Sequence, residues 1–253
     1  MRICIIGSGN VASVMAKTLY SCGHSISVIC GRNKKTASKL ATTVDALYIN
    51  HPSEIPDISD IYIIATDDRS IADVVKQLQD YNKTVVHTSG ATAIDVLQKF
   101  KSHGVLYPIN SITAKLKAVE EGTFFCIEAN SSTVNRKLRK VVTDIKCKSV
   151  IINSKERLAV HVAAVFANNF VNALYQASYN LLQEQNLKFD IIKPLLLTTL
   201  NNALITEPRK HQTGPAVRKD TITLKKHLSF LKSHPELKTI YSQLSKLIEE
   251  QQK

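Results

Sequence analysis

The stretch RICIIGSGNVA, residues 2–12, places two glycines and a small residue between an apolar run and a segment with helical spacing. Gly7, Gly9 and Ala12 match the G-x-G-x-x-G/A pattern, in which the first glycine permits a tight turn and the second lets the backbone approach a pyrophosphate. The N–H groups and the dipole at the start of the following helix favour an anion there. A second apolar run, residues 25–30, follows at the spacing of a βαβ unit, so the stretch predicts dinucleotide binding in a Rossmann unit.

The second apolar run ends in CGRNKK, residues 30–35, which contains no carboxylate. A fold that prefers NAD usually places Asp or Glu here, to bind the ribose hydroxyls. Arg32 could instead form a bidentate, charge-assisted contact with a 2′-phosphate. The segment therefore favours NADP(H) as cofactor, and the alternative is a solvated basic turn at the start of a helix.

The remaining chain changes character near residue 153. Before it, apolar runs alternate with helical patterns, which predicts an α/β doubly wound Rossmann sheet with a possible variation at its later edge. The predicted strands are residues 2–7, 25–30, 60–66, 84–90, 104–109, 123–129 and 148–153. After it, β-branched runs almost vanish, and residues 155–185, 189–205, 221–233 and 235–253 have helical patterns. We therefore expect an NADP-binding Rossmann domain over 1–153 and an all-α domain over 154–253.

Composition narrows the class of protein. The chain has 253 residues, of which 44% are hydrophobic, and a net charge of +12. No run approaches the roughly 18 uninterrupted apolar residues of a membrane span, and the first strand begins too early for a removable leader. The basic clusters lack aromatic residues that could stack on bases, and the five cysteines form no C-x-x-C pair. We expect a cytoplasmic protein with no membrane or nucleic-acid partner and no metal site.

Further strand ends belong with the glycine turn, because ligands of open α/β sheets bind beyond the carboxyl ends of the strands. ATDD, residues 65–68, and HTSGA, residues 87–91, end two predicted strands. His87 could line the nicotinamide side of the cleft, or it could be a structural histidine that holds its own loop. The candidate cofactor-binding residues are Gly7, Ser8, Gly9, Asn10, Val11, Arg32, Asn33, Lys34, Ala65, Thr66, Asp67, His87, Ser89 and Gly90.

A polar stripe interrupts the apolar sequence of the first long helix. His161, Asn168 and Asn172 are seven and four residues apart, so we expect them to share one face of the helix. Such side chains are costly to bury alone, so either they satisfy one another or they line a wet cleft. In the second case His161 could exchange a proton with a carbonyl or imine while Asn168 holds the oxygen or nitrogen. These two are the candidate catalytic residues.

The loop TGPAVRKD, residues 213–220, adds polar groups near the start of a later helix. Arg218 could clamp a carboxylate or phosphate of a substrate. Alternatively, Arg218 and Asp220 form a local pair that shapes the loop. The candidate substrate-binding residues are Tyr107, Asn172, Thr213, Gly214, Arg218 and Asp220.

Four motifs in this order resemble the Rossmann-like proteins of domain-of-unknown-function family 2520. The motifs are GSGNVA at 7–12, HTSGA at 87–91, HVAAVFANNF at 161–170 and TGPAVRKD at 213–220. That family resembles a larger group with an N-terminal NADP-binding domain and a helical domain of the 6-phosphogluconate dehydrogenase type. Relatives in the group include pyrroline-5-carboxylate reductase, ketopantoate reductase, prephenate dehydrogenase and deazaflavin-dependent NADP reductase.

The resemblance implies roles for particular residues. Gly7 to Val11 would hold the pyrophosphate and Arg32 the adenosine end, while His161 and Asn168 stand where relatives often carry Lys and Asn. The chain has Tyr107-Pro108 where the family tends to show His-Pro, so the Tyr107 hydroxyl would have to replace any contribution of that histidine. The group commonly dimerises through its helical domains, which implies a homodimer.

Two functions follow from these patterns. The first is an NADP(H)-dependent oxidoreductase, an enzyme that acts on a small anionic metabolite, with His161 as proton donor and Arg218 on the acid group. The second is an NADP(H)-binding sensor or regulatory protein without turnover. The Tyr107 departure and the lack of a lysine donor keep this second function open.

Overall fold

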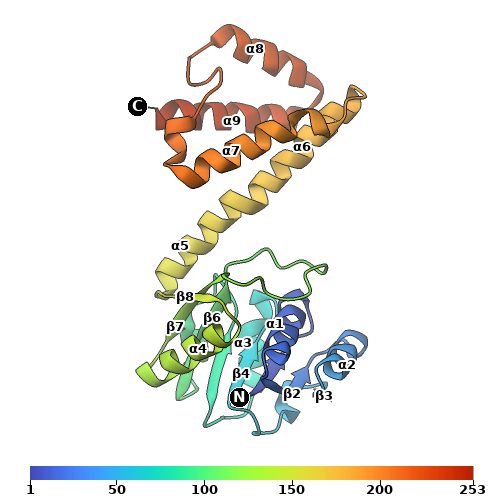
Figure 1. The fold of residues 1–253 in the computed structure, drawn as a ribbon, viewed down its shortest axis with the longest axis vertical. Helices are drawn as coiled ribbons and strands as arrows, with labels where there is room; N and C mark the ends of the chain where they lie inside the picture. Colours follow the sequence, from blue (N-terminus) through green and yellow to red (C-terminus); the bar gives the residue numbers. More distant parts are fainter. Residues whose placement is uncertain (253) are drawn as a thin grey trace. The chain divides into compact units, whose positions relative to one another are not determined.

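The computed structural model describes residues 1–252, and its contacts divide the chain into two compact units. The first unit runs from Met1 to Asn169 and contains the sheet, and the second begins at Phe170 and is helical (Figure 1). The helical region itself starts at Ser154, within the first unit. The domain boundary after residue 153 therefore stays a prediction, while the order of the two architectures is as predicted.

The first unit holds an eight-stranded sheet in the order β3-β2-β1-β4-β5-β6-β7-β8. The strands are β1 Arg2–Ile6, β2 Ser25–Cys30, β3 Leu47–Ile49, β4 Ile61–Ile64, β5 Thr84–His87, β6 Ser102–Pro108, β7 Phe124–Ala129 and β8 Lys148–Ile151. All neighbours pair in parallel except β6 and β7, which are antiparallel. The predicted doubly wound α/β fold is confirmed, and the antiparallel pair is its later-edge variation.

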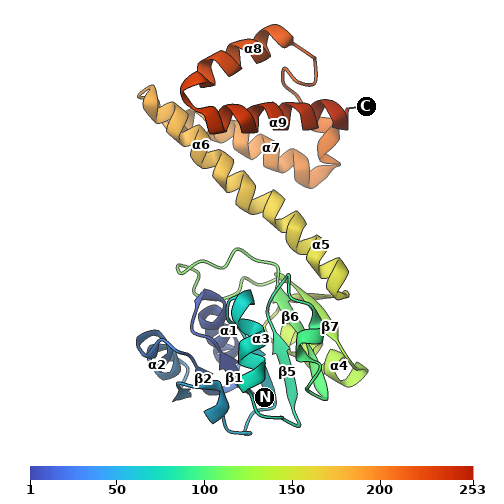
Figure 2. The same cartoon turned by 180° about the vertical axis from the view of Figure 1, so that it is seen from behind.

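Two apolar cores lie on the two faces of this sheet, because successive side chains of a strand point to opposite faces. Ile3 and Ile5 of β1 belong to one core, and Cys4 and Ile6 belong to the other. The first core is completed by helices α1 Asn10–Ser21, α2 Lys34–Thr43 and α4 Ser132–Asp144, and the second by α3 Asp68–Gln77 (Figures 1 and 2). These helices follow parallel strands, as right-handed βαβ units require.

The position of a ligand site follows from the strand order. The chain runs from β1 outward to β2 and β3, and then returns to place β4 on the other side of β1. In open α/β sheets a crevice forms at this reversal, outside the carboxyl ends of the strands. Gly7 after β1 and Ala65 after β4 stand at that point.

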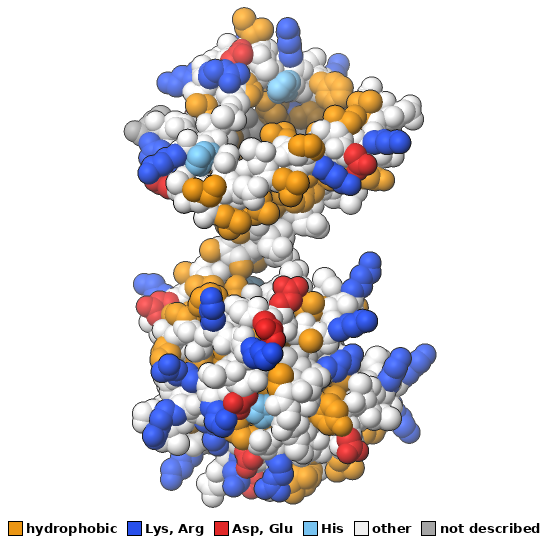
Figure 3. Space-filling view, in the orientation of Figure 1, with side chains coloured by type: hydrophobic (Ala, Val, Ile, Leu, Met, Phe, Trp, Pro, Cys, Tyr) orange, Lys and Arg blue, Asp and Glu red, His pale blue; other side chains and the backbone are white. Residues whose placement is uncertain are grey.

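The helical region begins with α5 Ser154–Ala164, continues through a π-helical segment Val165–Phe170, and enters α6 Val171–Glu184. It continues with α7 Lys193–Ile205, α8 Thr221–Phe230 and α9 Pro235–Gln251. Within the described residues from Phe170 onward, Ala216 and Leu231 are the only hydrophobic side chains that are buried. Hydrophobic side chains are accordingly prominent on the surface of this unit (Figure 3). The second unit has little apolar core of its own.

In the described part of the chain, the stretch Ser154–Glu184 is long and apolar enough to span a membrane by length and composition. The core helix of a soluble protein passes the same test. Its first turn holds Arg157, whose side chain is fully buried in the first unit.

Candidate cofactor site and active site

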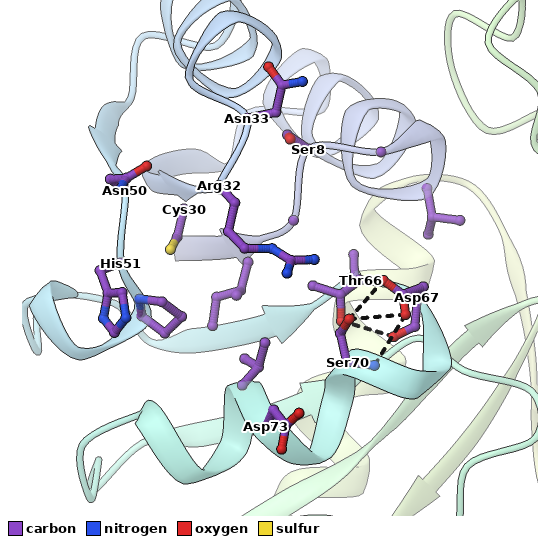
Figure 4. A pocket seen from close by; sticks show the side chains of 18 of the residues that line it. Ser8, Cys30, Arg32, Asn33, Asn50, His51, Thr66, Asp67, Ser70 and Asp73 are labelled. Atoms are coloured by element: carbon purple, nitrogen blue, oxygen red, sulfur yellow. Dashed lines mark hydrogen bonds between the residues drawn. The ribbon is translucent and has the colours of Figure 1, made fainter.

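A cavity of about 800 Å³ lies at the reversal of the strand order (Figure 4). It is bounded by the turns after β1, β2, β3 and β4 and by one side of α3. The predicted cofactor residues that line it are Gly7, Ser8, Gly9, Asn10, Val11, Arg32, Asn33, Ala65, Thr66 and Asp67. Lys34, His87, Ser89 and Gly90, which carry the same prediction, are not among its lining residues.

The two glycines of the turn meet different surroundings. Gly7 has a φ of +135°, and a Cβ atom on it would lie 2.2 Å from the carbonyl oxygen of Ala65, so no larger residue fits. A Cβ on Gly9 would have no atom within 4 Å, and Gly9 precedes α1 without a side-chain cap. Open space beside uncapped helix N–H groups fits an anion such as a pyrophosphate. These residues therefore fit the dinucleotide that the sequence predicts.

Arg32 extends into the cavity toward Thr66 and Asp67 (Figure 4). The pKa of Asp67 is lowered chiefly by the hydrogen bond from the Ser70 hydroxyl, and the positive charge of Arg32 lowers it further. Asn33 uses its side-chain oxygen to cap α2, where it accepts the Thr36 N–H at 3.2 Å. Arg32 is thus the cation of this end of the cavity, whereas Asn33 shapes the helix start.

His87 lies at the end of β5 and is fully buried. Its Nδ1 accepts the backbone N–H of Ser89 at 3.2 Å. Burial, with a smaller effect of the nearby Arg157 charge, lowers the pKa of His87 to about 4, so the ring is neutral at neutral pH. These contacts fit the structural alternative for this residue, a histidine that holds its own loop.

Three predicted residues from three elements meet at the same edge of the sheet. The Tyr107 hydroxyl of β6 is 3.0 Å from Nδ1 of His161 on α5, and the two rings meet edge to face. A Cβ on Gly90 would lie 2.7 Å from that nitrogen and 2.9 Å from Cζ of Tyr107. Burial is the main cause that raises the pKa of Tyr107, which keeps its proton at neutral pH. No spacing in the sequence indicates this hydrogen bond.

The π-helical segment changes the register of the polar stripe. It contains Asn168 and Asn169, and its i→i+5 hydrogen bonds place about one more residue in a turn than an α-helix does. Two turns after His161, the aligned residue therefore moves from Asn168 to Asn169. The prediction that His161 and Asn168 share one face is therefore wrong in register, because the π-helical segment departs from the α-helical spacing on which it was based.

The other substrate candidates lie in the second unit, Asn172 on α6 and the rest in the loop before α8. Asp220 caps α8, because its carboxylate accepts the N–H of Thr223 at 3.0 Å and its hydroxyl at 2.7 Å. These bonds are the main cause that lowers the pKa of Asp220, and Arg218 adds to them. The contacts of Asp220 therefore cap α8, and Arg218 acts on this carboxylate through its charge. Thr213 and Gly214 precede Arg218 in the loop, and Gly214 has a φ of +112°.

Several residues that line the cavity were not predicted from the sequence. Asn50 and His51 line the cavity because they follow β3, which is only three residues long, too short to show a strand period. Asp73 and Gln77 reach it from α3. A βαβ spacing argument could have found the third strand, since the classic order needs one at that edge.

The strand order and the glycine turn at its reversal define a Rossmann-type dinucleotide-binding protein. The family described as NADP oxidoreductase, coenzyme F420-dependent, matches residues 2–90. The domain of unknown function 2520 matches residues 123–248. Among curated proteins, no relative matches the sequence.

Solved structures give the family. A candidate NADP oxidoreductase from Bacteroides fragilis is 31% identical, with 98% of each chain covered and a TM-score of 0.87. The chain belongs to the family of NADP oxidoreductases that this protein represents. The predicted resemblance, the fold class and NADP as the cofactor of the family are thereby confirmed.

More distant structures share the fold. The 1-pyrroline-5-carboxylate reductase of Streptococcus pyogenes is 16% identical, with 99% of this chain and 98% of that chain covered and a TM-score of 0.66. An imine reductase from Myxococcus stipitatus, in complex with NADP⁺, is 13% identical, with 99% and 93% covered and a TM-score of 0.72.

Proposed function

We propose that this protein is an NADP(H)-dependent oxidoreductase that acts on a small anionic metabolite. One observation carries the proposal: the cavity with its glycine turn and the Tyr107–His161 pair stand at the same edge of one sheet. A dinucleotide that crosses the strand reversal has one half over β1 to β3 and the other over β4 to β6. Gly90 follows β5, and Tyr107 lies near the end of β6. The Tyr107–His161 pair therefore lies on the side of the half of the dinucleotide over β4 to β6.

The cofactor would be held by the residues that line the cavity. The N–H groups of Gly7 to Val11 would bind the pyrophosphate, and Arg32 with the start of α2 would bind the 2′-phosphate. When bound, NADP(H) supplies or accepts a hydride at its nicotinamide ring. The protein's part is then to bind the substrate and move one proton.

His161 would move that proton. Tyr107 keeps its own proton, so its hydroxyl would donate to Nδ1 in the tautomer of His161 that carries the ring proton on Nε2. In that tautomer His161 would offer a donor at Nε2 for a substrate oxygen or nitrogen, which Asn168, or Asn169 in the register set by the π-helical segment, would orient. Tyr107 takes the place that the family gives to a histidine, and Arg218 would bind the acid group of the substrate.

Titration with NADPH and NADH tests the cofactor part of the proposal. NADPH should bind more tightly than NADH. Arg32→Ala should lower the affinity for NADPH by about ten- to a hundredfold, as expected for the loss of a charge-assisted hydrogen bond of about 1.5–3 kcal/mol. The affinity for NADH should stay almost unchanged. Lys35→Ala is the matched control, because Lys35 is also on α2 but does not line the cavity. Tighter binding of NADH by the unchanged protein would refute the assignment of Arg32.

Turnover of keto acids, imines and hydroxy acids, followed by nicotinamide absorbance, tests the chemistry. His161→Ala should lower kcat by roughly 10²–10⁴-fold, the usual contribution of a general acid. His103→Gln serves as control, since His103 lies near the opposite end of β6 from Tyr107. Turnover that survives His161→Ala removes this residue from the donor role. NADPH binding without turnover of any of these substrates would support the sensor function instead.

The helical unit supports a further part of the proposal, a homodimer formed through it. Exposed hydrophobic side chains cover α7, among them Leu195, Leu197, Leu200 and Leu204. An exposed apolar surface of this kind usually marks an interaction site. A second copy of the chain would bury these side chains, and a cytoplasmic location, with no membrane partner, remains part of this prediction.

A further inference from the structure

The most deeply buried charge in the protein belongs to Arg157, in the first turn of α5. Its side chain is fully buried. The guanidinium donates hydrogen bonds to the Glu128 carboxylate of β7, to the carbonyl of Thr92 after β5, and to the Ser154 hydroxyl at 3.3 Å. One side chain therefore joins a strand, a strand-end loop and a helix start.

Ser154 adds to the same connection. Its N–H and its hydroxyl donate to the two oxygens of the Glu128 carboxylate at 2.9 and 2.8 Å. The hydroxyl also accepts the N–H of Ile94 at 3.1 Å. The start of α5 is thus held to β7 and to the loop after β5 by polar contacts as well as by packing.

His161 lies four residues after Arg157, one helical turn further along the same side of α5. Its ring meets Gly90 and Tyr107 with little spare room, since even a Cβ on Gly90 would overlap it. A rotation of about 20° would move an atom about 6 Å from a helix axis by about 2 Å. Such a rotation of α5 would break the 3.0 Å contact between Tyr107 and His161 or press the ring against Gly90.

A buried ion pair is a poor source of stability, because desolvation offsets much of its Coulomb energy. The directional hydrogen bonds of the pair nevertheless fix the rotation of α5 about its own axis. Apolar packing alone would allow a wider range of rotations. We propose that Arg157 and Glu128 are positioning residues that set the rotation of α5 so that Nδ1 of His161 meets the Tyr107 hydroxyl. This inference rests on the proposed function only where it predicts an effect of these residues on turnover.

The test replaces the pair and measures the tautomer of His161 by ¹⁵N NMR of the full chain. Arg157→Met with Glu128→Met leaves no lone buried charge and so should allow folding. In the unchanged protein the tautomer of His161 with its ring proton on Nε2 should dominate. In the double variant the ¹⁵N shifts should move to those of a ring that exchanges between tautomers. Tyr81→Phe is the control, because it removes a buried hydrogen bond to Ile55 elsewhere and should leave His161 unchanged.

A second variant covers the case in which the double variant does not fold. Ser154→Ala removes three polar contacts without stranding a charge, and it should shift the His161 signals in the same direction by a smaller amount. If the folded variants keep the His161 shifts of the unchanged protein, the positioning role is wrong.

Turnover separates this inference from the proposed function. With folding and NADPH affinity retained, kcat should fall by about 10–100-fold with little change in KM, as expected for a misplacement of about 1 Å. If His161→Ala keeps full turnover while the double variant still changes the tautomer, the catalytic role fails and the positioning role stands.

Discussion

At the scale of single residues, the glycine turn offers two substitutions with opposite expected effects. Gly7→Ala places a Cβ 2.2 Å from a backbone oxygen at a φ of +135°, so it should lower the free energy of unfolding by about 2 kcal/mol or more. Gly9→Ala meets no atom within 4 Å and should change stability by less than about 1 kcal/mol. Gly9→Ala should nevertheless lower the affinity for NADPH by at least about tenfold, because the Cβ would occupy the space in which the pyrophosphate binds.

Urea unfolding and NADPH fluorescence titration of both variants measure these effects. Each variant is the control for the other, since the same methyl group is added two residues apart. A Gly9→Ala protein that binds NADPH normally would show that the pyrophosphate does not approach this turn.

His87 makes a residue-scale prediction about pH. Its pKa of about 4 in the folded protein lies below its ordinary value, so the folded protein binds fewer protons than the unfolded chain. The free energy of unfolding is therefore unaffected by the titration of His87 above about pH 6.5. It falls as the pH drops toward 4, by about 3 kcal/mol in total. Urea unfolding between pH 7 and 4.5 measures this slope.

His87→Asn is the informative variant, because its side-chain oxygen can still accept the Ser89 N–H. Its stability at pH 7 should be lower, owing to the lost volume. Its decline between pH 6.5 and 4.5 should be shallower than that of the unchanged protein. Equal slopes would mean that His87 is not the group that titrates.

At the scale of elements, the π-helical segment Val165–Phe170 is the feature that periodicity does not predict. Insertion of one alanine after Ala164, which precedes the segment, should turn Asn168 and Asn169 by about 100° about the helix axis. NADPH affinity should be kept, because the cavity draws no residue from this helix, whereas turnover should fall at least about tenfold. NADPH titration and steady-state kinetics test this.

The matched control is Ala167→Gly, which keeps the length of the helix. It should cost about 1 kcal/mol of stability and leave turnover nearly intact. Full turnover after the insertion would show that the register of Asn168 and Asn169 does not matter for the reaction.

Other elements show why prediction succeeded or failed. The strands β1, β2 and β4 to β8, including the mostly exposed β8, were predicted from apolar runs rich in β-branched residues, whereas β3 was missed because it is only three residues long. The antiparallel pairing of β6 and β7 follows from tertiary contacts. Local pattern therefore predicts that a strand exists better than it predicts its partner.

At the scale of the whole molecule, the described hydrophobic side chains of the helical unit are mostly exposed, and only Ala216 and Leu231 among them are buried. The mass of the protein from sedimentation should therefore be about twice the 28.1 kDa of one chain. Leu197→Glu with Leu204→Glu should give the mass of one chain, because the charges would be buried at the interface. On an exposed surface the same changes would cost only about 0.5 kcal/mol each.

Sedimentation equilibrium distinguishes these cases, with Lys225→Glu on α8 as a control that should keep the higher mass. An unchanged protein that sediments as one chain would refute the homodimer. Partition of that single chain into lipid vesicles would assign the apolar helices to a membrane surface instead.

The stretch GSGNVA and its flanking apolar runs determined the Rossmann unit by themselves, because a tight turn and a period of two are properties of neighbouring residues. Arg32 likewise indicated NADP, since its position at a strand end follows from that unit. Only the tertiary structure brought Tyr107 to His161, 54 residues away, and Arg157 to Glu128. Those contacts depend on how α5 packs against β6 and β7, and no local pattern encodes the rotation of a helix on a sheet.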